Sequence, residues 1–208
     1  MLQRLLRINT VNPPGNERPA QELLMSHLRD AGLEVALVSE EADRPNLVAR
    51  LRGRAEGPVL GLLSHVDTVL AEPAGWRHGP WSGDLAEGYI WGRGALDMKS
   101  QTAAETVAMC SLAREGWRPA RGDLVLISVA DEEEDGTGAK WMCAEHPELV
   151  RCDYLLNEGG GEALAVDSER IYAVSIAEKG GCPWPPTTPW SSLPRCWRPW
   201  PPSGPAGT

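Results

Sequence analysis

Two nearly continuous apolar runs restrict the possible fold of this chain more than any other feature. The sequence PVLGLLS occupies residues 58–64, and GDLVLISVA occupies residues 122–130. Strands that are apolar at successive positions, without alternation, are typical of a parallel sheet that is covered on both faces. We therefore expect both runs to be buried strands of one sheet.

The elements that cover such a sheet are visible as helical patterns between the strands. In NERPAQELLMSHLRDAG, Ala20, Leu24 and Leu28 recur at helical spacing, with Asn16 placed to cap the helix and Gly32 to end it. Two further helices and three further strands are expected at about residues 98–115 and 138–146, and at 33–39, 46–51 and 152–157. This order predicts an α/β layered domain with a mostly parallel central sheet flanked by helices.

Composition excludes several classes of partner. The formal net charge of −9 argues against nucleic acid and anionic membranes, because both require clustered Lys and Arg. The five cysteines form no CxxC pair, which is typical of reduced thiols and a cytoplasmic protein. We find no signal-peptide pattern, and no apolar stretch approaches the length of a membrane span.

The last part of the chain has a different composition. Residues 182–208 hold half of the 18 prolines and four of the nine tryptophans, without an acidic residue. Such a segment forms neither helix nor ladder, so we expect a domain at residues 1–181 and a disordered tail at 182–208. A frameshift in a GC-rich gene would produce this composition, and we hypothesise one near residues 180–182.

Acidic and imidazole side chains follow three of the predicted strands. The first strand runs into His65 and Asp67, the second into the acidic run 131–135, and the third into Glu158, while Asp97 opens a helix. The carboxyl ends of parallel strands share one edge of a sheet, where open α/β folds place their sites. We therefore expect these side chains to converge.

Clustered carboxylates repel one another, and a divalent cation relieves that repulsion. Imidazole with carboxylates suits zinc or a neighbouring first-row metal, and a bridging carboxylate would allow two ions. Taken singly, each pattern has a simpler interpretation. The His-x-Asp pattern at residues 65–67 could be structural, the acidic run could be a solvated loop, and Asp97 could only cap its helix.

Four stretches together resemble a known family. SHVDTV, GRGALDMKS, ADEEEDGTGAKW and LLNEGG are similar to the signature stretches of the dizinc aminoacylase/carboxypeptidase family. Its members include acetylornithine deacetylases, succinyl-diaminopimelate desuccinylases, aminoacylases and related peptidases. The resemblance covers residues 1 to about 180, in the same order and with the same spacing.

The resemblance implies a centre of two divalent ions, zinc above all, with cobalt or manganese also suited to the ligands. His65 and Glu158 would bind the first ion, Glu133 would bind the second, and Asp97 would bridge both. The family typically has a cis peptide bond after the bridging aspartate, so the bond between Asp97 and Met98 is expected to be cis.

Two further residues receive catalytic roles from the resemblance. Asp67 would hold the second ring nitrogen of His65 and fix its tautomer. Glu132 would be the general base, taking a proton from the attacking water and returning it to the departing amine. The run of three glutamates also allows the register 133/134 for base and ligand, and we prefer 132/133 because Asp131 anchors the motif.

The activity implied is hydrolysis of an amide bond in a small-molecule N-acyl amino acid or peptide. Family members continue with a lid and dimerisation domain and a last metal-binding histidine, and neither is found after Gly181. We therefore expect a second metal site without its histidine and no turnover by this 208-residue chain. The sequence does not indicate the oligomeric state. The alternative is a non-catalytic metal-binding remnant or an inactive frameshifted product.

Overall fold

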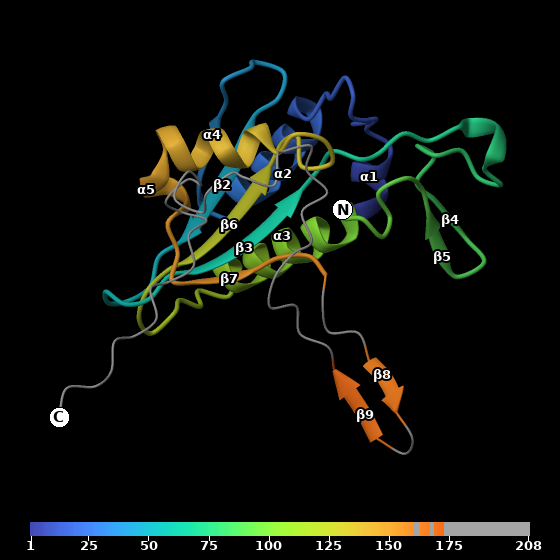
Figure 1. Cartoon of the computed structure of the whole chain (residues 1–208). Coiled ribbons are helices and arrows are strands. Elements are labelled where there is room, and N and C mark those ends of the chain that lie inside the picture. The colour runs from blue at the N-terminus through green and yellow to red at the C-terminus, as the bar shows by residue number, and fades with distance from the viewer. Residues whose placement is uncertain (160–162, 167–168, 173–208) are drawn as a thin grey trace, which may run out of the picture. The chain divides into compact units, whose positions relative to one another are not determined.

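The computed structural model describes residues 1–159, 163–166 and 169–172 (Figure 1). The chain divides into two compact units, Met1–Glu158 and Gly159–Thr208. The predicted boundary at Gly181 and the tail 182–208 lie outside the described residues. In the described part of the chain, no helix is both long and apolar enough to cross a membrane.

The first unit is built on a five-stranded mixed sheet with the strand order β1-β2-β6-β3-β7. The strands are β1 (Glu34–Val38), β2 (Asn46–Leu51), β3 (Leu60–His65), β6 (Leu124–Val129) and β7 (Tyr154–Leu156). β3 pairs in parallel with both β6 and β7, whereas β2 is antiparallel to both β1 and β6. Four of the five strands therefore run in one direction, and β2 alone is reversed.

Helices cover both faces of this sheet, as the apolar strands require. On one face, α1 (Leu2–Leu6), α2 (Arg18–Asp30) and α3 (Lys99–Arg114) form a core with Leu47, Ala49 and Leu126. On the other face, α4 (Thr137–Glu145) and α5 (Pro147–Val150) pack against Val48 and Ile127. Figure 1 shows α4 and α5 on the opposite side of the sheet from α3. Successive residues of β6 thus point into different cores, which explains its nearly continuous apolar sequence.

The α/β layered fold predicted from the sequence is confirmed, with two differences. The α2 helix begins after Glu17, and Asn16 does not cap it. The Glu17 carboxylate is fully buried and binds Arg44 Nη2 at 2.7 Å, so it serves a tertiary contact and not the helix end. The reversal of β2 is the second difference, and the apolar pattern of a buried strand carries no information about its direction.

A small hairpin lies within the segment 71–95, for which the sequence indicates no strand. After a 3-10 turn at Pro73–Gly75, β4 (Asp84–Ala86) pairs antiparallel with β5 (Tyr89–Trp91), apart from the main sheet (Figure 1). Glu87 and Gly88 connect the strands with φ values of 55° and 81°, which is typical of a two-residue hairpin turn. Strands of three residues are too short to show an alternating pattern.

The second unit contributes one described element, a hairpin of β8 (Ala163–Val166) and β9 (Glu169–Tyr172). The strands are antiparallel, with Ala163 opposite Tyr172, and their residues are exposed. The described residues contain the layered domain and this hairpin, and no lid domain.

Truncation of a central core residue tests this packing. Leu126 in β6 is fully buried, and Leu126→Ala is expected to lower the free energy of unfolding by about 2–5 kcal/mol through lost contacts and a residual cavity. Leu85→Ala in β4, where the side chain is 67% exposed, should change it by less than about 0.5 kcal/mol. Urea unfolding followed by circular dichroism measures both, and equal losses would contradict the described core.

Candidate metal centre

His65 is the buried centre of the cluster that forms at the carboxyl edge of the sheet. It ends β3 and is 1% exposed. Its backbone N–H donates to Met98 Sδ at 3.3 Å, and its backbone oxygen accepts from Thr102 Oγ1 at 2.9 Å. Ring nitrogen Nδ1 lies 3.1 Å from the Asp67 backbone oxygen and 3.3 Å from Asp67 Oδ1. These contacts hold the ring in one orientation.

The other ring nitrogen of His65, Nε2, faces three carboxylates from three different segments. It lies 3.3 Å from Glu158 Oε2, 3.3 Å from Asp97 Oδ1 and 3.6 Å from Glu132 Oε2. Glu158 follows β7, Glu132 follows β6, and Asp97 precedes α3. Since β3, β6 and β7 are parallel, their ends meet at one edge.

Glu133 completes the set of residues that the sequence singled out. Its backbone N–H donates to Asp67 Oδ2 at 3.1 Å, and its Oε1 accepts from Val69 N at 3.3 Å. Two groups have ligand atoms within 4.8 Å of one another: His65 with Asp97 and Glu133, and His65 with Glu132 and Glu158. Of the three consecutive glutamates, the first two enter these groups and Glu134 enters neither.

Asp97 does not cap the helix that follows it, which was the simpler interpretation of this residue. The α3 helix has Met98 at its N-cap position and no side-chain capping bond, so Asp97 does not cap it. The peptide bond between Asp97 and Met98 is cis, as the resemblance implied. The Asp97 side chain is 64% exposed and reaches the open side of the cluster.

Electrostatics divide the carboxylates of the cluster into two kinds: a hydrogen bond to His65 lowers the pKa of Glu158, whereas the pKa values of Asp97, Glu132 and Glu133 are raised. Burial opposes the charged form of His65, but hydrogen bonds to Asp67 and Glu158 outweigh it and raise its pKa to about 11. Partial burial raises the pKa of Glu132 to about 7, with the charges of Glu158 and Glu133 adding to the effect. Burial and neighbouring carboxylates also raise the pKa values of Asp97 and Glu133. The open side of the cluster therefore carries more negative charge than its protein surroundings compensate.

This donor set fits a divalent cation. An imidazole nitrogen and carboxylate oxygens form two groups that share His65, and these are ligands of zinc and its first-row neighbours. The raised pKa of His65 has a related cause, because the neighbouring carboxylates Asp67, Glu158 and Glu132 favour the charged form of its ring.

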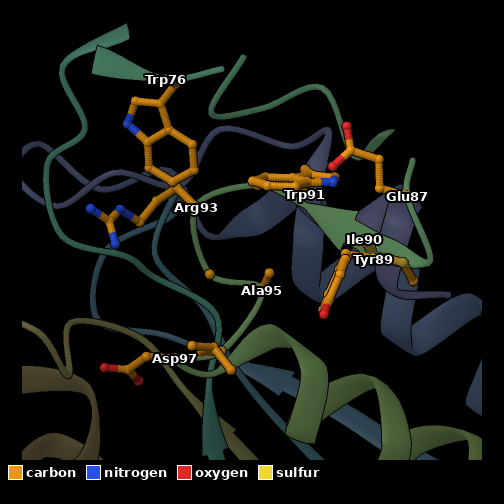
Figure 2. A pocket seen from close by; sticks show the side chains of 11 residues that line it. Trp76, Glu87, Tyr89, Ile90, Trp91, Arg93, Ala95 and Asp97 are labelled. Atoms are coloured by element: carbon orange, nitrogen blue, oxygen red, sulfur yellow. The ribbon is translucent and has the colours of Figure 1, made fainter. Parts of the chain in front are cut away.

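A pocket adjoins the cluster at Asp97 (Figure 2). The Arg93 guanidinium lies 5.3 Å from the ring centre of Trp76, and Figure 2 shows both above Asp97. Arg93 makes no ion pair with a described carboxylate, and its Nη2 donates to the Leu70 backbone oxygen at 3.2 Å. Other side chains of the pocket wall come from the β4–β5 hairpin: Glu87, Tyr89, Ile90 and Trp91.

Sequence reasoning missed a buried polar network beneath the cluster. Arg44 Nη2 lies 2.7 Å from Glu17 Oε1 and 3.0 Å from Asp131 Oδ1, and Asn12 donates to Asp131 as well. Asn12 and Glu17 belong to the stretch LLRINTVNPPGNE at residues 5–17. No local pattern in it indicates a contact with Asp131.

The layered domain with this edge cluster has a clear match among known families. The sequence pattern of peptidase family M20/M25/M40 matches residues 61–190, which is more than half of the chain. The chain belongs to this family of metallohydrolases.

The relatives of known name include succinyl-diaminopimelate desuccinylases. The one from Paracoccus denitrificans is 39% identical over 155 residues, covering 72% of this chain and 39% of the relative. The one from Cereibacter sphaeroides strain ATCC 17029 is 34% identical over 154 residues, covering 71% of this chain and 39% of the relative. This chain therefore spans about two fifths of the length of these relatives.

Solved structures share the fold. An M20 family metallo-carboxypeptidase from Sulfolobus solfataricus matches with a TM-score of 0.63 at 21% identity, over 77% of this chain and 36% of that chain. The dipeptidase Dug1p from Saccharomyces cerevisiae matches with a TM-score of 0.60 at 16% identity, over 78% of this chain and 39% of that chain.

Replacement of the central imidazole tests the metal centre. His65→Ala is expected to weaken Zn²⁺ binding by more than about 100-fold, because losing a ligand costs more than losing a residue that only orients one. His78→Ala is the matched control, since His78 stacks on Trp91 and bonds Asp84 in the hairpin segment. Competition with a chromophoric chelator measures both, and unchanged affinity in His65→Ala would place the metal elsewhere.

Proposed function

We propose that this chain carries part of the catalytic domain of a metal-dependent hydrolase that cleaves the amide bond of N-acyl amino acids or small peptides. The observation that carries the proposal is the convergence of three carboxylates from separate segments on Nε2 of one buried histidine. Family membership and the names of the relatives support this reaction class.

The proposed centre takes two divalent ions, with zinc favoured and cobalt or manganese also suited. His65, Asp97 and Glu158 would hold the first, and Asp97 and Glu133 the second. When bound, such ions polarise a carbonyl and lower the pKa of water. Asp67 is proposed to keep Nδ1 of His65 occupied, so that Nε2 is the nitrogen presented to the ion.

Glu132 is the proposed general base. Its side chain is 43% exposed and borders the cluster, so it can reach a water at the open side. In the reaction, Glu132 takes a proton as the water oxygen bonds to the amide carbon. It then gives this proton to the amide nitrogen as the carbon–nitrogen bond breaks, which yields a carboxylic acid and a free amine.

The proposed substrate is a small molecule with an acyl group on an amino acid or peptide nitrogen. The relatives include succinyl-diaminopimelate desuccinylases, whose name describes removal of a succinyl group from diaminopimelate. The pocket beside Asp97, with its aromatic wall and Arg93, offers room next to the cluster for a substituent of the scissile amide. The net charge of −9 supports neither nucleic acid nor an anionic membrane as partner.

A second candidate function is metal binding without catalysis. Both candidate ligand groups use His65, so the described residues offer one imidazole for two ions. An assay on this chain separates the candidates. Metal-dependent release of amine from N-succinyl and N-acetyl amino acids supports the hydrolase. Binding of about one ion at His65 without hydrolysis above background, which we expect of this chain alone, supports metal binding as the function of this chain by itself and leaves hydrolysis as the reaction of a complete catalytic domain.

A substitution of Glu132 tests the division between base and ligands. Glu132→Gln in this chain should keep Zn²⁺ affinity within about threefold, whereas Glu133→Gln should lower it by more than about tenfold through loss of a ligand. At the aligned glutamate of the full-length Paracoccus denitrificans relative, the same change should reduce turnover by about 10²–10⁴-fold.

Glu134→Gln is the control for these measurements, because Glu134 belongs to neither ligand group. Loss of metal in Glu132→Gln with retention in Glu133→Gln would reverse the assigned roles. Loss in Glu134→Gln would establish the register 133/134.

A further inference from the structure

The segment that follows α1 lies against the residues that follow β3. Asn12 N donates to the Thr68 backbone oxygen at 2.9 Å, and Thr68 N donates to the Thr10 backbone oxygen at 3.1 Å. Thr10 Oγ1 also donates to the Val66 backbone oxygen at 2.5 Å. This pairing brings Asn12 beside Asp67, where it is 2% exposed.

The Asn12 side chain connects two buried carboxylates. Its Nδ2 lies 3.0 Å from Asp67 Oδ2 and 2.8 Å from Asp131 Oδ1. A primary amide has two N–H donors on one nitrogen, so each carboxylate can receive its own hydrogen bond. Neither Asp nor a hydrophobic side chain of similar size supplies two donors at this point.

The two carboxylates that Asn12 joins hold different parts of the centre. Asp67 Oδ1 lies 3.3 Å from Nδ1 of His65, and Asp67 Oδ2 accepts from the backbone N–H of Glu133 at 3.1 Å. Asp131 directly precedes Glu132 and lies in the left-handed region with φ of 60°. Its Oδ2 accepts from Thr137 N at 3.1 Å and Thr137 Oγ1 at 2.6 Å, at the start of α4.

We infer that Asn12 is a positioning residue of the metal centre, whose amide ties the carboxylate that orients His65 to the carboxylate that starts the loop of Glu132 and Glu133. It acts through Asp67 and Asp131 and touches no proposed ligand itself. The inference rests on the proposed function, because Asn12 would position a metal centre. The hydrogen bonds on which it depends are formed by protein atoms alone.

A purely structural role for Asn12 makes a different prediction. Gln21 is also a fully buried amide, and its Nε2 donates to the Ser128 backbone oxygen at 3.1 Å. Its amide donates to this backbone oxygen and to neither Asp67 nor Asp131, so its loss removes a buried hydrogen bond without releasing either carboxylate. Gln21→Ala is therefore the matched control for Asn12→Ala, and Asn12→Asp keeps the side-chain shape without its donors.

The first measurement is nuclear magnetic resonance of the metal-free chain, with the His65 ring signals assigned by comparison with His65→Gln. The Hδ1 proton of His65 should be sharp in the unsubstituted chain and in Gln21→Ala. It should be lost to solvent exchange, or clearly shifted, in Asn12→Ala and Asn12→Asp. Persistence of the same Hδ1 signal in both Asn12 variants would overturn the inference.

The second measurement is Zn²⁺ affinity, which should fall by about 10–100-fold in both Asn12 variants and stay within about threefold in Gln21→Ala. Equal losses of Zn²⁺ affinity in all three variants would mean that Asn12 has only a structural role. If the unsubstituted chain binds no Zn²⁺, the proposed function fails, and the His65 signal still decides the inference.

A third measurement needs no substitution and covers the case in which the Asn12 variants do not fold. In the unsubstituted chain, both Nδ2 protons of Asn12 should exchange slowly with solvent, because each donates to a buried carboxylate. Rapid exchange of either proton would contradict the bridge.

Discussion

The parallel pairing of β3 with β6 and β7 is the constraint on which the candidate centre depends. Parallel neighbours end at the same edge of a sheet, so the residues that follow these strands arrive together although they are far apart in sequence. His65, Glu132 and Glu158 are close for this reason. Because β2 runs antiparallel to β6, the residues that precede β2 also lie at this edge. Because β2 begins where β6 ends, Arg44 lies beside Asp131.

The carboxylates at this edge form two layers, a buried one in which pKa values are lowered and an open one in which they are raised. In the buried layer, hydrogen bonds and ion pairs outweigh the effect of burial and lower the pKa values of Asp67 and Asp131. Their partners include His65, Asn12, Thr137 and Arg44. In the open layer, burial and mutual repulsion raise the pKa values of Asp97, Glu132 and Glu133. The buried layer is ionised and fixes the geometry of the cluster. A cation bound at the open layer would balance the negative charge of its carboxylates.

The comparisons place this edge inside the matched part of the family, because residues 61–190 include the ends of β3, β6 and β7. The chain spans about 39% of the length of the named desuccinylases, so their activity belongs to proteins longer than this one. Three residues that precede the matched range belong to the buried polar network around Asp131: Asn12 and Arg44 bind Asp131, and Glu17 binds Arg44. The supporting layer is therefore contributed largely by the N-terminal third of the chain.

By itself, the sequence determined the two buried strands, the helices that cover them and the side chains at the strand ends. These features follow from local periodicity and from the rule that parallel strands share an edge. Tertiary structure decided which of the three glutamates enter the cluster, the direction of β2, the hairpin at β4 and β5, and the place of Asn12. The partners of the Asn12 amide are 55 and 119 residues away in the sequence. A hydrogen bond is specified by what lies opposite a donor in space, and a local pattern contains no record of that distant partner.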